Sequence, residues 1–120
     1  MTERTQKQLD NIRAALLQRK QDLAGEIEDV RNQLDEDQER VAEDARDGGA
    51  PDAQTGIDHA MVARDVKEVQ DIDAALKRIA DGDYGTCIDC GAEIESARLA
   101  AYPTAKRCMP CQVKRERESR

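Results

Sequence analysis

Apolar residues recur along the first 46 residues at steps of three, four and seven positions, with polar residues between them. A stripe of this kind lies on one face of a helix, and the intervening Glu, Gln, Arg, Lys and Ala residues are good helix formers. The pattern predicts a helix over residues 6–46, with a slip near Arg19 and Lys20 and a weak point at Gly25. The stripe consists of Leu9, Ile12, Leu16, Leu23, Ile27, Val30, Leu34 and Val41.

A second apolar stripe predicts a second helix over residues 57–80. Thr55 is its expected N-cap, Asp58 is the expected capping-box partner three residues later, and Gly82 supplies a left-handed stop. The glycine- and proline-containing segment 47–56 separates the two helices. The second stripe consists of Val62, Val66, Val69, Ile72, Leu76 and Ile79.

Two amphipathic helices joined by a short loop are expected to pack as an antiparallel hairpin. Narrow apolar stripes with charged flanks suit a coiled coil. We therefore assign residues 1–81 to a helical hairpin with an acidic tip loop near residues 47–55. A solvent-exposed helical pair used for dimerisation fits the same periodicity, which does not separate the two interpretations.

All four cysteines lie in two Cys-x-x-Cys pairs, Cys87/Cys90 and Cys108/Cys111, with 17 residues between the pairs. Two intervening residues let both sulfurs of a tight turn face one ion, and the longer spacing is typical of a four-cysteine zinc site. Four thiolates leave no open coordination position. The spacing therefore predicts one structural Zn²⁺ and no catalytic metal.

Two disulfides, a redox pair and an iron–sulfur cluster are the competing interpretations of these cysteines. The absence of a signal peptide disfavours disulfides, the absence of a βαβ pattern disfavours a redox pair, and paired turns on a small β-type finger favour zinc over iron. Gly91 suits a turn with positive φ, and Pro110 suits the first turn of a helix. We assign residues 82–120 to a zinc finger with a short C-terminal helix over residues 112–120. The apolar residues expected to cover the metal are Ile94, Leu99 and Ala105.

Composition and charge narrow the fold class and the partners. The 120 residues are 38% charged and include two Tyr but no Phe or Trp, so a thick core is excluded and the metal is expected to staple a mainly α fold. The net charge of −7 makes free nucleic acid a poor partner, and no apolar run is long enough to span a membrane. Acids outnumber bases by ten to three in residues 28–52, whereas bases outnumber acids by six to two in residues 106–120.

The acids beside the predicted hairpin loop are Asp44, Asp47, Asp52 and Asp58. In the ordinary interpretation they are solvated surface residues. In the functional interpretation they form an acidic tip that enters a deep cavity of a larger partner, where they act on Mg²⁺ or on basic side chains. His59 is expected at the surface, and Arg98 and Tyr102 are either partner contacts or local packing. No catalytic constellation can be assembled from the sequence, so we do not expect an enzyme.

Residues 83–112 closely resemble the four-cysteine zinc finger of the DksA/TraR family of bacterial transcription regulators. The resemblance implies a protein that binds RNA polymerase through its secondary channel. It further implies that the hairpin tip approaches the catalytic Mg²⁺ and that promoter DNA is not contacted. We expect the protein to be cytoplasmic, because no signal peptide is present, and monomeric. The features that carry the resemblance are Tyr84-Gly85, Cys87, Cys90-Gly91, Ile94, Arg98-Leu99, Pro103-Thr104-Ala105, Cys108 and Cys111.

The sequence departs from the family at the tip, where the family carries Asp-x-x-Asp-x-Ala. Asp58 and Ala60 match the second half of that pattern, but Thr55 replaces the first Asp. Asp44 and Asp47 match the Asp pair, but a glycine replaces the Ala. We favour Asp58 because it opens the predicted second helix, whereas a gap-free count from the first cysteine favours Asp47. The assignment stays open at this point.

A second departure concerns guanosine tetraphosphate. Family members that bind this alarmone carry an Arg before the finger proline and a Lys after the last cysteine, where this chain has Tyr102 and Gln112. Losing two cations weakens capture of a polyphosphate, so we expect little or no dependence on the nucleotide.

Two other functions compete with this interpretation of the sequence. One is a zinc- or thiol-responsive sensor, and the other is a non-enzymatic helical adaptor.

Overall fold

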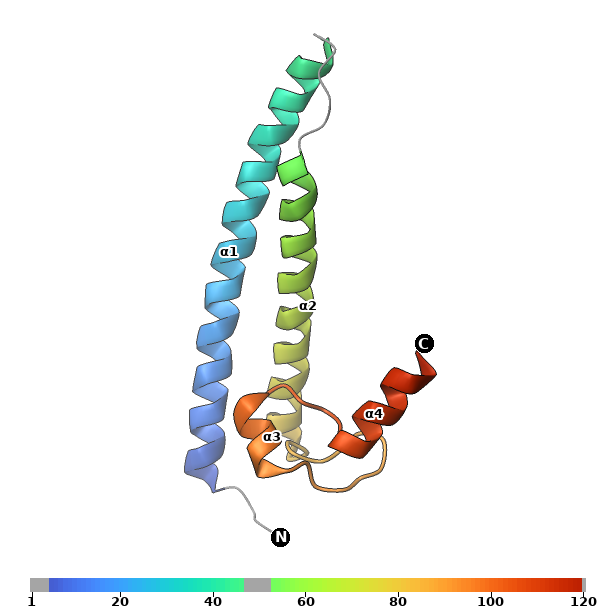
Figure 1. The fold of residues 1–120 in the computed structure, drawn as a ribbon. Helices are drawn as coiled ribbons and strands as arrows, with labels where there is room; N and C mark the ends of the chain where they lie inside the picture. Colours follow the sequence, from blue (N-terminus) through green and yellow to red (C-terminus); the bar gives the residue numbers. More distant parts are fainter. Residues whose placement is uncertain (1–4, 47–52, 120) are drawn as a thin grey trace. The chain divides into compact units, whose positions relative to one another are not determined.

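The computed structural model describes residues 5–46 and 53–119, although not the side chains of residues 40, 41, 43–46 and 53–55. Four helices follow one another along the chain: α1 (Gln6–Arg46), α2 (Ala53–Asp81), α3 (Ser96–Ala101) and α4 (Met109–Glu118) (Figure 1). The described residues contain no strand, and a single antiparallel bridge joins Thr86 to Glu93. These findings confirm the predicted mainly α fold with two long helices, a cysteine finger and a C-terminal helix. Asp47 and the side chain of Asp44 lie outside the described residues.

Helix α1 has the bounds that the apolar stripe predicts. A capping box begins it, which the sequence analysis did not foresee. The backbone N–H of Gln8 donates to Thr5 Oγ1 at 3.1 Å, and the N–H of Thr5 donates to Gln8 Oε1 at 2.9 Å. Two backbone donors at the start of the helix are therefore satisfied by side chains.

Helix α2 begins at Ala53, four residues before the predicted start. Thr55 therefore lies inside the helix, and its assignment as the N-cap is wrong. Gly82 ends the helix as predicted, with a φ of 81°. Its N–H donates to Ile79 O at 3.3 Å and the N–H of Asp83 donates to Arg78 O at 2.8 Å, which together form a Schellman motif.

The chain divides into two compact units. Unit 1 comprises Met1–Leu17 and Asp71–Arg120, and unit 2 comprises Gln18–Gln70. Each unit contains a segment of both long helices. These units are defined by contacts and not by independent folding, so the predicted division between residues 81 and 82 stays a prediction.

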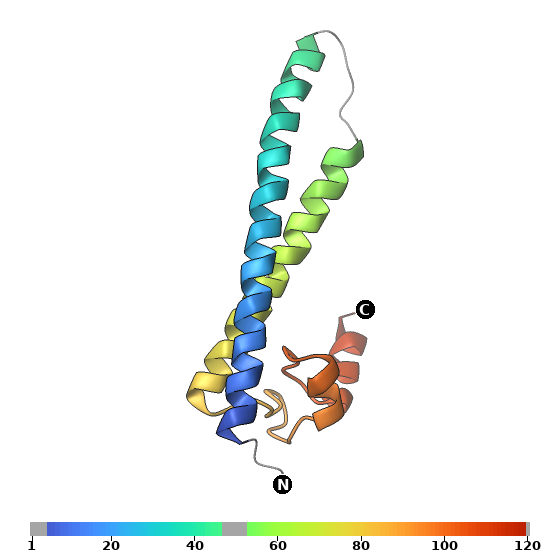
Figure 2. The ribbon, with the colours of Figure 1, turned by 90° about the vertical axis from the view of Figure 1, so that its left-hand side faces the viewer.

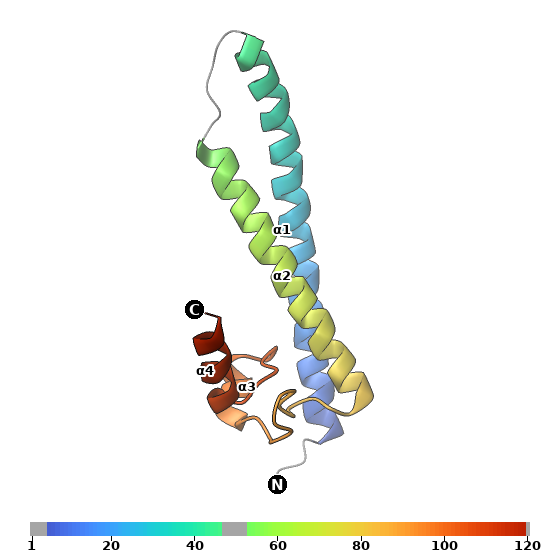
Figure 3. The same cartoon turned by 90° about the vertical axis from the view of Figure 1, so that its right-hand side faces the viewer.

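Unit 2 is a pair of antiparallel helical segments (Figures 2 and 3). Arg19 of α1 binds Glu68 of α2 through Nε–Oε2 and Nη2–Oε1 distances of 2.7 and 3.3 Å, which shows the register of the pair. Leu23 is completely buried, whereas Ile27, Val30 and the other stripe residues described in this unit are half-buried.

Unit 1 combines the start of α1, the end of α2 and the cysteine finger. Two polar contacts fasten the finger to the residues around the end of α2: Tyr84 Oη donates to Pro103 O at 2.8 Å, and Arg78 Nη2 donates to Thr104 O at 3.3 Å. Its buried apolar and cysteine residues are Leu16, Ile72, Ala75, Tyr84, Cys87, Ile94, Leu99, Ala105 and Cys108.

Two helices of the finger differ from the prediction. Helix α3 was not foreseen, although Ser96–Ala101 is rich in Ala, Leu and Arg, which favour helix formation, and ends just before a proline. Helix α4 begins at Met109 and not at residue 112, because Cys108 is its N-cap and Pro110 occupies its first turn. None of the described helices is long and apolar enough to cross a lipid bilayer.

Candidate metal centre

The first cysteine pair lies on a tight turn whose shape is set by backbone hydrogen bonds and a glycine. The N–H of Gly91 donates to Cys87 O at 3.0 Å, and the N–H of Cys87 donates to Ala92 O at 2.8 Å. Gly91 has a φ of 75°, which a residue with a Cβ adopts only under strain. The positive φ predicted for Gly91 is confirmed. The turn presents Cys87 and Cys90 on one side.

The second cysteine pair lies at the start of α4. Cys108 is the N-cap, and Cys111 is the third helical residue, so both belong to the same helical turn. The N–H of Gln112 donates to Cys108 O at 2.9 Å and closes that turn. Pro110 fits between the two cysteines because the first turn of a helix needs no N–H donor from it.

Three hydrogen bonds join the segment before α4 to the rest of the finger. The N–H of Ile88 donates to Lys106 O at 2.9 Å, and Arg98 Nε donates to Arg107 O at 3.1 Å. Arg107 Nε donates to Asp89 Oδ2 at 2.7 Å, and the Arg107 side chain is only 10% exposed. Asp89 lies between the two cysteines of the first pair in the sequence, and Arg107 directly precedes the first cysteine of the second pair. The ion pair therefore connects the two cysteine turns.

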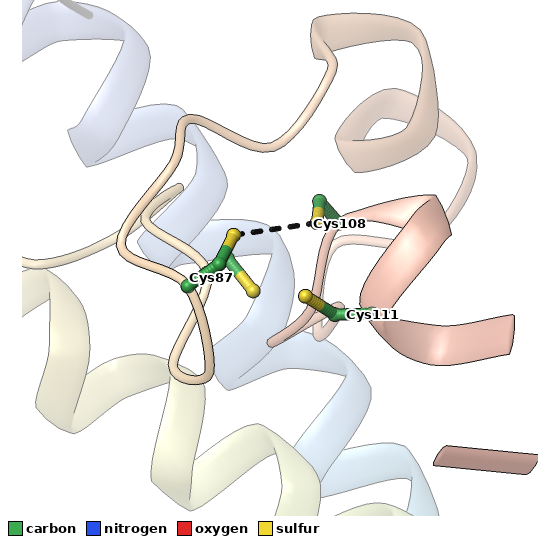
Figure 4. Close-up of side chains that lie close together, drawn as sticks. Cys87, Cys108 and Cys111 are labelled. Atoms are coloured by element: carbon green, nitrogen blue, oxygen red, sulfur yellow. Dashed lines mark hydrogen bonds between the residues drawn. The ribbon is translucent and has the colours of Figure 1, made fainter. Parts of the chain in front are cut away.

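The four sulfurs converge on one point. The Sγ atoms of all four cysteines lie within 4.8 Å of one another, and Cys90 Sγ is 3.7 Å from Cys108 Sγ. Figure 4 shows the side chains of Cys87, Cys108 and Cys111 directed toward a common centre. A tetrahedral ion with Zn–S bonds of about 2.3 Å places its sulfurs about 3.8 Å apart. The four cysteines therefore fit one zinc ion.

The electrostatics of the cluster call for a cation. Burial opposes ionisation of Cys87, but backbone N–H donors, led by that of Cys90, lower the pKa of this thiol to about 6. Interaction with the neighbouring thiols of Cys108 and Cys90 instead raises the pKa of Cys111 to about 12. Four thiolates this close repel one another unless a dication lies between them. Zinc binding supplies that charge and stabilises the fold of the finger.

Access to the four sulfurs is uneven. Cys87 and Cys108 are buried, Cys111 is half-buried and Cys90 is exposed. A surface cavity of about 330 Å³ adjoins the two accessible cysteines. Its lining residues are Asp89, Cys90, Cys111, Lys114, Arg115 and Glu118. The apolar residues predicted to cover the metal, Ile94, Leu99 and Ala105, are all buried.

Arg98 and Tyr102, the candidate partner contacts in the finger, pack against each other. The Arg98 guanidinium carbon lies 5.6 Å from the centroid of the Tyr102 ring. Arg98 Nη1 also lies 3.4 Å from Met109 Sδ. Arg98 is therefore engaged in local packing, whereas Tyr102 is 48% exposed.

Asp58 is the one candidate hairpin acid whose side chain the structure describes, and it differs from the solvated residue that the ordinary interpretation predicts. Asp58 is the sixth residue of α2, not one of its first turn, and only 8% of it is exposed. Asp37 and Asp65 are also buried, at 5% and 4% exposure. Ala60 and His59 are exposed, and His59 is not among the residues that converge on the metal centre.

The burial of Asp37 and Asp65 was not foreseen, although a seven-residue spacing signals it. Asp37 follows Leu16, Leu23 and Val30 at successive steps of seven. Asp58 and Asp65 precede Ile72 and Ile79 in the same way. Residues seven apart lie on nearly the same face of a helix, so these acids occupy positions that the apolar stripe fills elsewhere. The predicted stripes consist of apolar residues alone, so they do not include these acids.

The fold and the cysteine site define a mainly α protein with a four-cysteine zinc finger. Residues 82–117 match the family model of the prokaryotic dksA/traR C4-type zinc finger. The RNA polymerase-binding transcription factor DksA of Caulobacter vibrioides is 32% identical over 114 residues, which cover 95% of this chain and 80% of that protein. The chain belongs to the DksA/TraR zinc finger family.

Further comparisons agree with this assignment. The RNA polymerase-binding transcription factor DksA of Escherichia coli is 42% identical over 50 residues, covering 42% of this chain and 33% of that protein. The structure of transcription factor DksA2 from Pseudomonas aeruginosa has a TM-score of 0.74 and 28% identity, covering 95% of this chain and 87% of that one. A transcriptional regulator Dks from Chlamydia trachomatis shares the fold, with a TM-score of 0.61 at 24% identity, covering 97% of this chain and 95% of that one.

Proposed function

We propose that this chain is a transcription regulator that binds RNA polymerase and modulates initiation through the secondary channel. The observation that carries the proposal is the match to a polymerase-binding factor over 95% of the chain, which includes both long helices and the zinc finger. In this proposal the protein acts as a monomer, catalyses no reaction and makes no sequence-specific contact with DNA. Zn²⁺ has a structural role, because its four ligands are all cysteines.

The acids of the hairpin supply the chemistry. Residues 28–52 carry ten acids and three bases, which favours approach to basic side chains or to Mg²⁺ in a partner. The candidate tip residues are Asp44, Asp47, Asp58 and Ala60. Because Asp58 is buried in the free chain, a direct role for its carboxylate requires a change in unit 2 on binding, whereas Ala60 is already exposed.

Separate substitutions of the acids test this proposal. Core RNA polymerase is captured with the wild-type chain and with D44N, D47N and D58N, and each chain is assayed in multi-round transcription. We expect all four chains to bind polymerase. One substitution is expected to reduce the effect on transcription at least tenfold, and that substitution identifies the tip acid. Failure of the wild-type chain to bind polymerase contradicts the proposal. Full activity of all three variants contradicts the role of the tip.

We further propose that regulation depends little on guanosine tetraphosphate. Tyr102 and Gln112 occupy the positions where alarmone-binding members of the family carry cations. Gln112 Nε2 donates to Glu116 Oε1 at 3.1 Å, so a carboxylate also lies beside this position. The alarmone is expected to change the transcriptional effect of the wild-type chain less than twofold. The double variant Y102R/Q112K is expected to gain a response, and a strong wild-type response contradicts this part of the proposal.

A zinc- or thiol-responsive sensor is the second candidate function. The observation that favours it is the exposure of Cys90 and the half-exposure of Cys111 beside a cavity that contains Lys114 and Arg115. An exposed thiolate is open to oxidation. The test is to titrate the zinc-loaded protein with a mild oxidant while recording zinc release and transcriptional activity together. Zinc retention at oxidant concentrations that leave the protein otherwise intact contradicts a sensor.

A further inference from the structure

Unit 2 buries carboxylates where a helical pair ordinarily buries apolar side chains. Among its described side chains, Leu23 is the one apolar residue that is buried. The other buried residues are three aspartates, which we call the acidic seam: Asp37, Asp58 and Asp65. Transfer of a carboxylate out of water is unfavourable unless donors or cations replace its hydration.

Asp65 shows this most clearly. It is 4% exposed, and its Oδ2 has no hydrogen-bond partner within the described part of the chain. The charge of Asp65 contributes to the raised pKa of Arg19, but the larger contributions come from the hydrogen bond and charge of Glu68. Arg19 is committed to Glu68 through two hydrogen bonds. The buried oxygen of Asp65 is therefore left without a donor.

The register of the helical pair places two of these acids, Asp65 and Asp58, near the level of apolar residues of α1. Because Arg19 pairs with Glu68, Asp65 lies at about the level of Leu23, and Asp58 at about the level of Val30. Asp37 accepts a hydrogen bond from Gln33 Nε2 at 3.1 Å, and Asp58 has an interaction of its own within the chain. Asp37 and Asp58 thus each have a partner within the chain, whereas Asp65 Oδ2 has no hydrogen-bond partner among the described residues.

We propose that the acidic seam is a conformational device that lets unit 2 open locally. Opening returns the carboxylates to water, so it requires less free energy than opening a helical pair with an apolar seam. The open form exposes Asp58, which is buried in the closed form. That the exposed Asp58 then meets a partner rests on the proposed function, whereas the opening itself does not.

The opening is tested by amide hydrogen exchange of the full-length, zinc-loaded chain. In D65L the apolar side chain removes the cost of burying a charge, so amides of residues 59–70 are expected to exchange at least tenfold more slowly than in the wild-type chain. The matched control is D73L, which replaces an exposed aspartate of the same helix. Its exchange over residues 59–70 is expected to change less than twofold. Unchanged or faster exchange in D65L overturns the proposal.

A second variant and a second measurement guard against an effect of the new leucine itself. D65N removes the charge with little change of shape, and it is also expected to slow amide exchange over residues 59–70. No slowing in D65N overturns the proposal.

Carbodiimide labelling of carboxylates, read by mass spectrometry, follows the exposure of Asp58 directly. Labelling of Asp58 is expected to fall several-fold in D65L while that of the exposed Asp35 stays constant. Equal labelling of Asp58 in both chains overturns its release on opening.

These measurements require no polymerase, so they separate the two proposals. If the wild-type chain fails to bind polymerase, the proposed function is contradicted and the exchange result stands. If exchange is unaffected by the seam substitutions, the conformational device is contradicted even when polymerase binds normally.

Discussion

The two units of this chain bury different chemistry. Unit 1 buries apolar and cysteine residues, and its one buried charge among the described side chains, Arg107, has an ion-pair partner in Asp89. Among its described side chains, unit 2 buries one leucine and three aspartates, and one oxygen of these aspartates has no hydrogen-bond partner there. The same kind of amphipathic helix therefore contributes to an interior whose buried charge is paired in one unit, and to an interior with one unpaired aspartate oxygen among its described side chains in the other.

The difference follows from the number of segments that contribute to each interior. Two helices cover each other along one seam only, so the stripe residues of unit 2 remain half-buried. In unit 1 the two helices are joined by the turns and short helices of the finger, and completely buried residues such as Ile94 come from outside the helical pair. A metal-stabilised finger thus supplies the core that a helical pair without Phe or Trp lacks.

Removal of zinc is expected to have the largest effect and to affect unit 1. Binding of structural zinc contributes on the order of 10 kcal/mol to the folding of small zinc domains. Chelation, or the substitution C108S, is expected to abolish amide protection over residues 84–118 while exchange over residues 20–40 changes little. Hydrogen exchange with a zinc-release assay measures both. Restored protection on adding zinc back to the chelated protein is the control, and protection that survives complete zinc loss contradicts the structural role.

Truncation of a buried isoleucine in the finger is expected to have the next largest effect. Ile94 is 1% exposed and Ile88 is 52% exposed, so the two form a matched pair in the same finger. I94A is expected to lower the free energy of unfolding by about 2–5 kcal/mol because it leaves a cavity. I88A is expected to change it by less than about 0.5 kcal/mol. Urea denaturation of the zinc-loaded chains measures both, and equal losses contradict the assignment of the core.

Two ion pairs, one from each unit, provide the comparison with the smallest expected effects on stability. In unit 1, D89N leaves the buried Arg107 guanidinium with a weaker acceptor and is expected to cost about 1–3 kcal/mol. In unit 2, the Arg19–Glu68 pair is solvent-exposed, with side chains 49% and 39% exposed, so E68Q is expected to have no measurable effect. Denaturation at low and high salt measures both. A larger loss in E68Q than in D89N contradicts the contrast between the units.

Local pattern was sufficient to predict the two long helices and the metal ligands. The stripe from Leu9 to Val41 gave both bounds of α1, and the positive φ of Gly82 at the end of α2 followed from its place after the last stripe residue. The spacing of the four cysteines identified the site where the sulfurs converge. The helices depend on residues that are close in sequence. The metal site depends on cysteine ligands, whose spacing is typical of a zinc site.

The start of α2 and the state of the hairpin acids were not predictable in this way. Thr55 matched the chemistry of an N-cap, but helix-forming residues before it allowed the helix to begin earlier. The exposure of Asp58 was inferred from its place near a loop, whereas its burial depends on where the other helix of the pair lies. Helix α3 was also missed because its six residues are too few to show a periodic stripe.

The sequence by itself determined the long helices, the metal and its ligands, and membership of a family, because helical periodicity and ligand spacing are local properties of the chain. Only the tertiary structure decided which charged residues are buried and which have partners. Burial is a property of neighbours far apart in sequence: the partner of Glu68 is 49 residues away, and that of Arg107 is 18 residues away. The pattern of residues along one helix does not specify which side chains of the facing helix lie opposite them.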